Sequence, residues 1–199
     1  MGRCTKPAIS QVFGLSASDH AVTIDGVLDD WTELPYVVED PVEIDGDESS
    51  WTGAADCSYR FGIRTDQRFL YIAIEVIDES PVYLQKVPWQ QDGIEVRLDG
   101  RPDPARSNNR GESDRNMANY LFIGLSPDPD PAKMSVVESE RLAELGIKAI
   151  SVPTINGHNT EIAVPLTYLE KLQGADWQRI RLNIAVDDFD AEDNRLAQV

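Results

Sequence analysis

The chain has 199 residues, 41% of them hydrophobic, which is enough for one large domain with a buried core. Its 35 Asp and Glu residues outnumber the 18 Lys and Arg residues, and the formal charge is −17. We therefore expect no nucleic-acid or membrane partner, because affinity for phosphate groups comes from clustered Lys and Arg. Such a surface suits neutral ligands, cations or basic partners, and otherwise its acidity serves solubility.

Cysteine and histidine are too scarce to define a site. Cys4 and Cys57 cannot build a disulfide framework, and their spacing leaves open whether they pair. There is no CxxC motif, and His20 lies far from His158 in sequence, so a zinc site is not expected. No apolar run reaches the length of a membrane span, and the N-terminus lacks the apolar region of a signal peptide.

The first part of the chain predicts a short strand and a turn of helix. Residues 21–24 are apolar and β-branched enough for a strand, which Asp25 and Gly26 close as a turn. Leu28 and Trp31 follow at a spacing of three, which indicates one helical turn with Asp29 or Asp30 as its cap.

The strongest β-signal follows. Residues 56–64 alternate and residues 69–78 return after a polar turn, so the two segments predict a hairpin. The inward face of the first strand would carry Cys57, Tyr59, Phe61 and Ile63. Residues 93–99 alternate again, with Ile94, Val96 and Leu98 facing inward and Glu95 and Arg97 outward.

The second half predicts more strands and two short helices. Residues 126–133 hold three prolines and are expected to form no regular element. Asn156 and Gly157 are typical of a hairpin turn. The other expected elements are a loop over 101–115, strands over 120–125, 147–153, 160–165 and 179–186, and helices over 139–145 and 166–172.

About eight strands separated by turns predict an all-β fold. The expected architecture is an antiparallel β-sandwich, immunoglobulin-like or jelly-roll-like, with short peripheral helices. We expect an N-terminal arm over residues 1–20 and a single domain over residues 21–199, together a fragment of a larger protein.

Four blocks in this order resemble the family 9 carbohydrate-binding modules. Residues 23–31 (TIDGVLDDW) are similar to the family's opening IDGxLDxxW, and residues 69–78 (FLYIAIEVID) to its LYV strand with the following VxD. Residues 88–96 (PWQQDGIEV) resemble PWEQDSVEI, and residues 182–188 (LNIAVDD) resemble the closing FNIQVND. Together the blocks span roughly residues 21–199.

The resemblance implies a non-catalytic module of a secreted, polysaccharide-acting protein, hence extracellular or periplasmic. Its partners would be a terminal sugar or oligosaccharide and the catalytic domain of the larger chain. By position, Trp89 matches a stacking Trp and Glu95 a ligand-bonding Glu; an aromatic ring packs on a pyranose face while a carboxylate accepts hydroxyl hydrogen bonds. The expected ligand-binding residues, or residues that shape the loop, are Trp89, Gln91, Asp92, Glu95 and Asn119.

Some positions depart from the family pattern and favour a second hypothesis. The family's FRVN strand supplies a sugar-binding Arg and Asn, whereas residues 119–123 are apolar at both positions, Leu121 and Ile123. Arg97 replaces a residue that is usually apolar, and the second stacking Trp would lie near the end of the chain. The alternative is a structural or docking β-sandwich that has lost sugar binding, with Trp89 packed over the sandwich edge. Trp31 and Trp51 are expected to be core or lid residues, and Trp177 is expected to be structural.

The acidic run after the last full strand predicts a metal site. Asp187, Asp188 and Asp190 offer the carboxylate oxygens that calcium takes, and the resemblance implies structural calcium. The run does not match an EF-hand loop, and the alternative is a solvated acidic loop.

Two further alternatives are weighed. Asp92 and Glu95 are close in sequence, as a carboxylate pair of a hydrolase would need to be in space, but the resemblance gives no support for catalysis. Some relatives bind haem through Met and Lys, and Met117, Met134 and Lys133 are the residues for a haem-binding electron-transfer domain.

Overall fold

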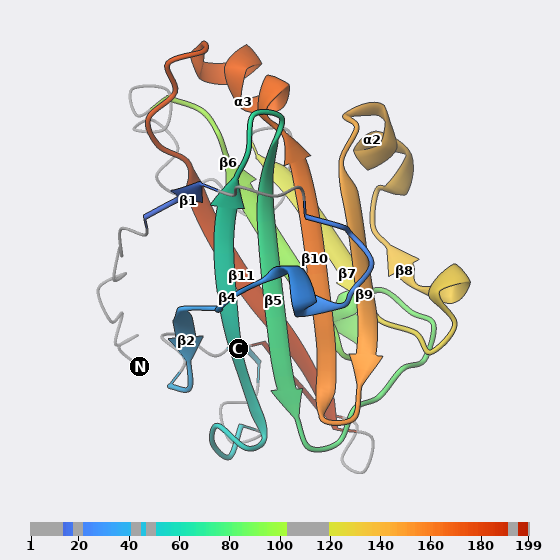
Figure 1. The fold of residues 1–199 in the computed structure, drawn as a ribbon. Coiled ribbons are helices and arrows are strands. Elements are labelled where there is room, and N and C mark those ends of the chain that lie inside the picture. The colour runs from blue at the N-terminus through green and yellow to red at the C-terminus, as the bar shows by residue number, and fades with distance from the viewer. Residues whose placement is uncertain are drawn as a thin grey trace, which may run out of the picture.

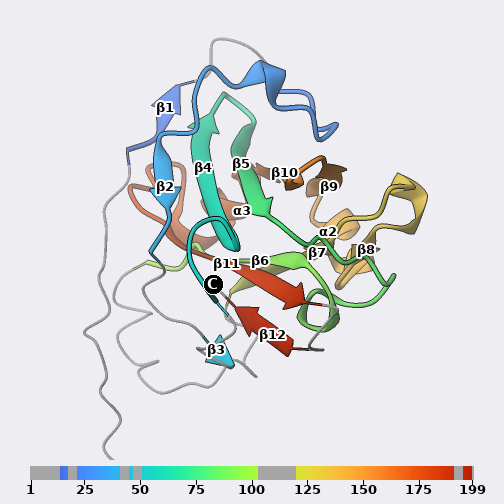
Figure 2. The ribbon, with the colours of Figure 1, turned by 90° about the horizontal axis from the view of Figure 1, so that it is seen from below.

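The computed structural model describes residues 14–17, 22–40, 45–46, 51–102, 120–190 and 195–198. Two sheets of mainly antiparallel strands lie face to face, as Figure 2 shows from the end of the molecule, with short helices at the periphery (Figure 1). The predicted all-β sandwich is confirmed. No helix within the described ranges is long and apolar enough to cross a membrane.

The first sheet has the order β1-β4-β5-β10-β9, and β2 also pairs with β4. Both predicted hairpins, β4 with β5 and β9 with β10, are present. The strands are β1 (Ser16–Ala17), β2 (Tyr36–Val38), β4 (Cys57–Thr65), β5 (Phe69–Asp78), β9 (Lys148–Thr154) and β10 (Gly157–Pro165). The strand predicted over residues 21–24 is wrong, because the described part of this segment, from Val22, lies across the sheet and pairs with no strand.

The second sheet has the order β3-β12-β11-β6-β7-β8. Its strands are β3 (Asp45–Gly46), β6 (Gly93–Asp99), β7 (Leu121–Ser126), β8 (Ser135–Val136), β11 (Arg181–Asp190) and β12 (Arg195–Gln198). The last full strand is longer than predicted, because β12 pairs with the end of β11 and extends it through Asp190. Asp187, Asp188 and Asp190 therefore lie in a strand, not in a solvated loop.

The helices are short. They are η1 (Leu28–Asp30), η2 (Pro88–Gln90), η4 (Pro131–Lys133), α2 (Ser139–Glu144) and α3 (Leu166–Gln173). The proline-rich segment does contain one regular turn, η4, because Asp130 accepts a hydrogen bond from the Ala132 N–H at 3.2 Å and Pro131 occupies the first helical position. Neither Asp29 nor Asp30 caps η1, and Asp30 instead accepts from the Thr23 N–H at 2.8 Å.

The main core lies between the two sheets. Alternate residues of β4, β5, β6 and β10 face inward, as the period of two predicts for a strand with one buried face. Completely buried members include Leu70, Ile72, Ile74, Ile94, Leu98, Leu121, Ile123 and Ile162. Trp51 and Trp177 pack against the edge of this core, in agreement with the structural role expected for them.

A second, smaller core covers the outward face of the first sheet. The segment with η1 crosses β4, β5 and β10 (Figure 1) and packs Trp31 on Tyr71, Ala73 and Ala163. The buried carboxylate of Glu161 on β10 accepts from the Gly26 N–H at 2.8 Å, the Asp25 N–H at 3.1 Å and the Trp31 Nε1–H at 3.0 Å.

The sequence block 23–31 is therefore a structural cover over β10. Gly26 has φ +82°, and a Cβ atom there would collide with Val152, so the block requires glycine at this position. The guanidinium of Arg64 lies 4.7 Å from the centroid of the Trp31 ring. Burial raises the pKa of Glu161, although its three hydrogen-bond donors oppose that rise.

Candidate functional site

The outward face of the second sheet carries an unusual pair of charged residues. Residues of β6 with odd numbers point away from the core, as predicted for Glu95 and Arg97. Strand register places Glu95 between Ala185 on β11 and Gly124 on β7. The same register places Arg97 between Asn183 and Phe122. This face therefore carries two neighbouring cross-strand rows of three residues, with Glu95 at the centre of one and Arg97 at the centre of the other.

Contacts join these two rows. An Nη2–H of Arg97 donates to Glu95, and an Nη1–H donates to the Asn183 side-chain oxygen at 3.3 Å. The guanidinium also lies 5.4 Å from the centroid of the Phe122 ring. The Arg97 side chain is 23% exposed and that of Glu95 is 5% exposed, so solvent reaches the arginine first. The Nε–H of Arg97 is buried and has no hydrogen-bond partner.

Trp89 lies at the end of this face. It belongs to η2, which packs against β6, β7, β11 and β12 of the second sheet. Pro88 sits over Gly93, since a Cβ at Gly93 would lie 2.7 Å from the Pro88 Cβ, and Gly93 faces outward two residues before Glu95. Trp89 is 43% exposed, whereas Trp31 is buried. Trp89 therefore offers a partly exposed aromatic surface in a segment that packs against this sheet.

Gln91 and Asp92 shape the loop that holds Trp89. The Gln91 side chain accepts from the Leu84 N–H and donates to the Lys86 carbonyl oxygen at 2.5 Å. Asp92 accepts from the Val82 N–H and from the Phe189 N–H at 2.7 Å. Both side chains are almost completely buried, so their role is the loop-shaping one of the two that the sequence suggested. Asn119 lies outside the described residues.

Register corrects one expectation about the neighbouring strand, β7: Leu121 and Ile123 do not share a face with Glu95.

 Leu121 and Ile123 point into the core, and the outward positions of β7 are Phe122 and Gly124. The side chains that neighbour Glu95 and Arg97 are therefore a glycine and an aromatic ring. The alternation in residues 120–125 predicted a strand, but only its pairing with β6 shows which residues share the face with Glu95.

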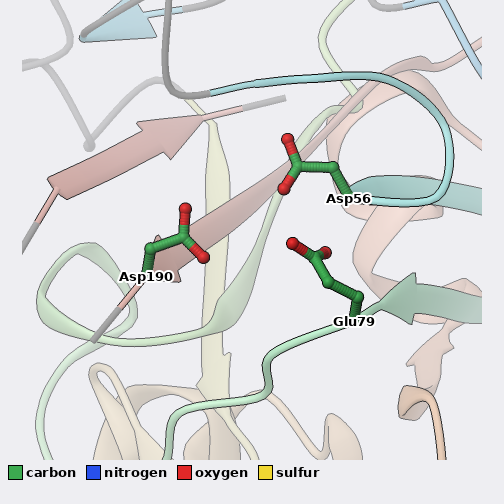
Figure 3. Close-up of side chains that lie close together, drawn as sticks. All are labelled: Asp56, Glu79 and Asp190. Atoms are coloured by element: carbon green, nitrogen blue, oxygen red, sulfur yellow. The ribbon is translucent and has the colours of Figure 1, made fainter. Parts of the chain in front are cut away.

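A second cluster of charge lies at the end of the sandwich near the start of β6. Carboxylate oxygens of Asp56, Glu79 and Asp190 lie within 4.8 Å of one another and point toward a common centre (Figure 3). Asp78, Asp92 and Asp188 form another such group within the same distance. These residues come from the start of β4, the end of β5, the start of β6 and the end of β11.

The carboxylates of this cluster repel one another. Burial, and then the charge of Asp78, raise the pKa of Asp92 to about 9. Burial, and then the charges of Asp78 and Asp56, raise the pKa of Asp188 to about 8. Burial raises the pKa of Glu79 to about 7. Within the described part of the chain, Asp78, Asp92 and Asp188 form no ion pair with Lys or Arg, so three like charges lie close together in this group.

The predicted metal ligands are only partly brought together. Asp188 and Asp190 each belong to one of the two carboxylate groups, while Asp187 is in neither and lies on the alternate face of β11. Sequence reasoning missed Asp56, Asp78 and Glu79 as members, and it placed Asp92 with the ligand-binding residues. Their shared signal is that each acid lies at a strand end, where hairpin pairing brings ends together.

The residues weighed for haem serve other contacts. The Met134 sulfur accepts from the Ser151 N–H at 3.0 Å, and Lys133 lies 3.7 Å from a carboxylate oxygen of Asp130. Met117 lies outside the described residues. Asp92 and Glu95, weighed as a hydrolase pair, lie in different surroundings, since Asp92 joins the carboxylate group and Glu95 pairs with Arg97.

Comparisons with known proteins agree with the fold and with the sequence blocks. The family described as "Carbohydrate family 9 binding domain-like" matches residues 24–198. A family 9 module from Caldicellulosiruptor kristjanssonii, solved in complex with glucose, has a TM-score of 0.60 at 18% identity, covering 92% of this chain and 82% of that chain. A structure of a family 9 module from the same organism with cellotriose has a TM-score of 0.58 at 16% identity, covering 92% and 80%. A comparison with curated proteins gave no match.

The fold and the match together define the class. Two facing sheets of mainly antiparallel strands define a β-sandwich domain. The chain belongs to the family 9 carbohydrate-binding domain-like family, since the match spans almost all of it.

Proposed function

We propose that this chain is a non-catalytic carbohydrate-binding module that stacks a sugar ring on Trp89. The observation that carries the proposal is the exposed Trp89 ring at the end of the outward face that holds Glu95 and Arg97. An indole ring offers a flat apolar surface to the C–H groups of a pyranose, and charged side chains beside it bond the hydroxyl groups. The sugar complexes of the two similar structures support this choice of ligand.

The loop that carries Trp89 is fixed before any ligand arrives. Gln91 and Asp92 hold four backbone groups of the loop and of β11, and the Tyr83 hydroxyl donates to the Gly157 carbonyl oxygen at 3.0 Å. A fixed platform loses little conformational entropy on binding, which favours affinity from a small contact area.

Isothermal titration calorimetry with glucose and cellotriose tests the proposal. We expect Trp89→Ala to lower affinity at least about tenfold, because stacking on one aromatic ring contributes roughly 1–3 kcal/mol when bases stack on proteins, a comparable contact. Leu84→Ala is the matched control, since Leu84 lies in the same loop with the same 43% exposure and has no aromatic face. Equal affinity of Trp89→Ala and wild type, or no binding by the wild type to any glucan, xylan or cello-oligosaccharide, would contradict it.

A wild-type protein that binds none of these sugars would favour the structural alternative. The low exposure of Glu95 and its bond to Arg97 are the observations on that side. In that case the domain would dock or space a catalytic domain of a larger chain. For either role we propose an accessory domain of a secreted, polysaccharide-acting protein, extracellular or periplasmic, which the full reading frame of the gene tests through a signal peptide and a neighbouring hydrolase or lyase domain.

We further propose structural calcium at the two carboxylate groups. Calcium takes six to eight oxygen ligands, and these groups supply carboxylates whose mutual repulsion a cation would relieve. Thermal unfolding in EDTA and in millimolar calcium tests this. We expect calcium, but not equal ionic strength of sodium chloride, to raise the melting temperature by several degrees. An unchanged melting temperature, with no heat of calcium binding, would contradict it.

A further inference from the structure

We infer that Arg97 makes the direct polar contact with the bound sugar and that Glu95 is a positioning residue beneath it. This rests on the proposed sugar site at Trp89. It reverses the expectation from the sequence, in which Glu95 bonds the ligand and Arg97 is only a departure from the family pattern.

Arg97 is more exposed to solvent than Glu95. Both side chains point outward from β6, but Glu95 is 5% exposed and Arg97 is 23% exposed. A ligand that approaches this face therefore meets the guanidinium before the carboxylate. Among the described residues, the hydrogen-bond partner of Glu95 is Arg97, so the carboxylate positions the guanidinium.

The surroundings of Arg97 fix its orientation. Glu95 accepts from Nη2, the Asn183 side-chain oxygen accepts from Nη1, and the Phe122 ring lies 5.4 Å from the guanidinium carbon. A guanidinium has five N–H donors, and these contacts use two of them. The buried Nε–H has no partner, which is the kind of donor that a ligand oxygen or a bridging water satisfies.

Charge defines the class of ligand. The guanidinium is offset by Glu95 within the same pair, so no net positive charge is left to attract an acidic sugar. Donors that project from a neutralised arginine suit the hydroxyl and ring oxygens of a neutral sugar. We therefore assign this position to neutral hexose units, because the Glu95 charge offsets the attraction that Arg97 would otherwise have for a uronic acid.

Calorimetry with cellotriose and with glucuronic acid tests the assignment on four variants. We expect Arg97→Gln to lose cellotriose affinity at least about tenfold, because a hydrogen bond to a charged group is worth roughly 1.5–3 kcal/mol. Arg97→Lys should lose several-fold, because lysine lacks the planar fork. Glu95→Gln should lose less than about threefold, because a glutamine oxygen can still accept from Arg97. Wild type should bind cellotriose more tightly than glucuronic acid.

Arg101→Gln is the matched control. Arg101 is 19% exposed and pairs with Asp99 at the same two-residue spacing, beyond the end of β6. We expect its affinity to stay within about twofold of wild type. The double variant Glu95→Gln with Arg97→Gln leaves no unpaired buried carboxylate, so it tests the contact if Arg97→Gln alone unfolds, and it should bind as weakly as Arg97→Gln.

The outcomes separate the two proposals. A wild type that binds no sugar defeats the proposed function itself. A wild type that binds, with Arg97→Gln or the double variant unchanged, overturns the role of Arg97 and leaves the module in place. A tenfold loss in Glu95→Gln with no loss in Arg97→Gln would return the direct contact to Glu95, and tighter binding of glucuronic acid than of cellotriose would overturn the ligand class.

Discussion

Among the described residues, each sheet carries one buried glutamate on its outward face. Trp31 packs on the first sheet, and Trp89 belongs to η2, which packs against the second. On the first sheet, Glu161 accepts from two backbone N–H groups and from the Trp31 indole, and the chain itself covers the face. On the second sheet, Glu95 is bound by Arg97, and Trp89 stands exposed at the end of the face. The same residue types thus form a covered contact on the first sheet and a partly exposed one on the second.

A structural site and a candidate binding site differ here in whether their polar groups already have partners. The donors to Glu161 are two backbone N–H groups and the Trp31 indole N–H, all from the chain itself, so no ligand is needed to complete this site. The face with Glu95 ends instead in a partly exposed guanidinium with an unused donor. A buried polar group that lacks a partner calls for one, and here a ligand or water can supply it.

The largest expected effect is the difference in the free energy of unfolding between the Trp31→Ala and Trp89→Ala variants. Trp31→Ala should lower the free energy of unfolding by about 4 kcal/mol, because it empties a packed position in the second core. Trp89→Ala should change it by less than about 1 kcal/mol, because most of the gain from burial is absent there. Urea unfolding measures both, and equal losses would abolish the comparison.

Glu161, like Trp31, should contribute to the stability of the fold and not to sugar affinity. Glu161→Ala should cost about 3 kcal/mol, because it strands three donors beneath the cover. Sugar affinity should stay unchanged in that variant at a temperature where it remains folded. Glu140→Ala, at an exposed position of α2, is the control with an expected change below about 0.5 kcal/mol. A Glu161→Ala variant as stable as this control would show that the cover does not depend on Glu161.

The carboxylate groups extend the comparison to buried acids that lie against one another. The pKa values of Asp92 and Asp188, about 9 and about 8, exceed the unfolded value of about 3.9, so the folded chain binds more protons at intermediate pH. Without calcium, stability should fall as pH rises from about 4 to about 8, on the order of 1 kcal/mol per pH unit. Urea unfolding in EDTA across this range measures the slope, which saturating calcium should remove. A stability that rises with pH in EDTA would contradict it.

The smallest effect should come from neutralising one carboxylate. Asp188→Asn removes a charge from the group with Asp78 and Asp92, so it should stabilise the metal-free protein at pH 8 by about 1 kcal/mol. The same variant should lose most of the stabilisation by calcium. Asp176→Asn, at an exposed position, should change neither quantity. Loss of stability in EDTA for Asp188→Asn would indicate that repulsion is not what its carboxylate contributes.

Sequence patterning predicted the parts that depend on neighbours along the chain. The hairpin of β4 and β5, the inward face of β6 and the helices α2 and α3 follow from period-two or helical spacing and from turn residues. The short strands β1, β2, β3 and β8 were not predicted, since each has only two or three residues and no pattern of its own. Long-range pairing, not local propensity, makes them strands.

The candidate site was predicted in its residue types more than in its contacts. Trp89 and Glu95 were found through the block that they share, and the exposure of Trp89 agrees with the role expected for it. Arg97 was treated only as a departure, because it replaces a usually apolar residue of the family pattern. Its contacts with Asn183 and Phe122 could not be foreseen, since both lie on other strands. The carboxylate groups draw on four separate segments, so the acidic run at the end of β11 revealed only two of their members, Asp188 and Asp190.

By itself, the sequence determined the all-β class, the inward faces of the long strands and the family to which the blocks belong. Alternation and turn chemistry act between residues close in the chain, and a pattern of residues records them. The tertiary structure alone decided that Glu161 is sealed under its own chain while Glu95 lies beneath Arg97. Burial and hydrogen-bond partners depend on which distant strands pair, and strand register sets that only once the sheets have formed.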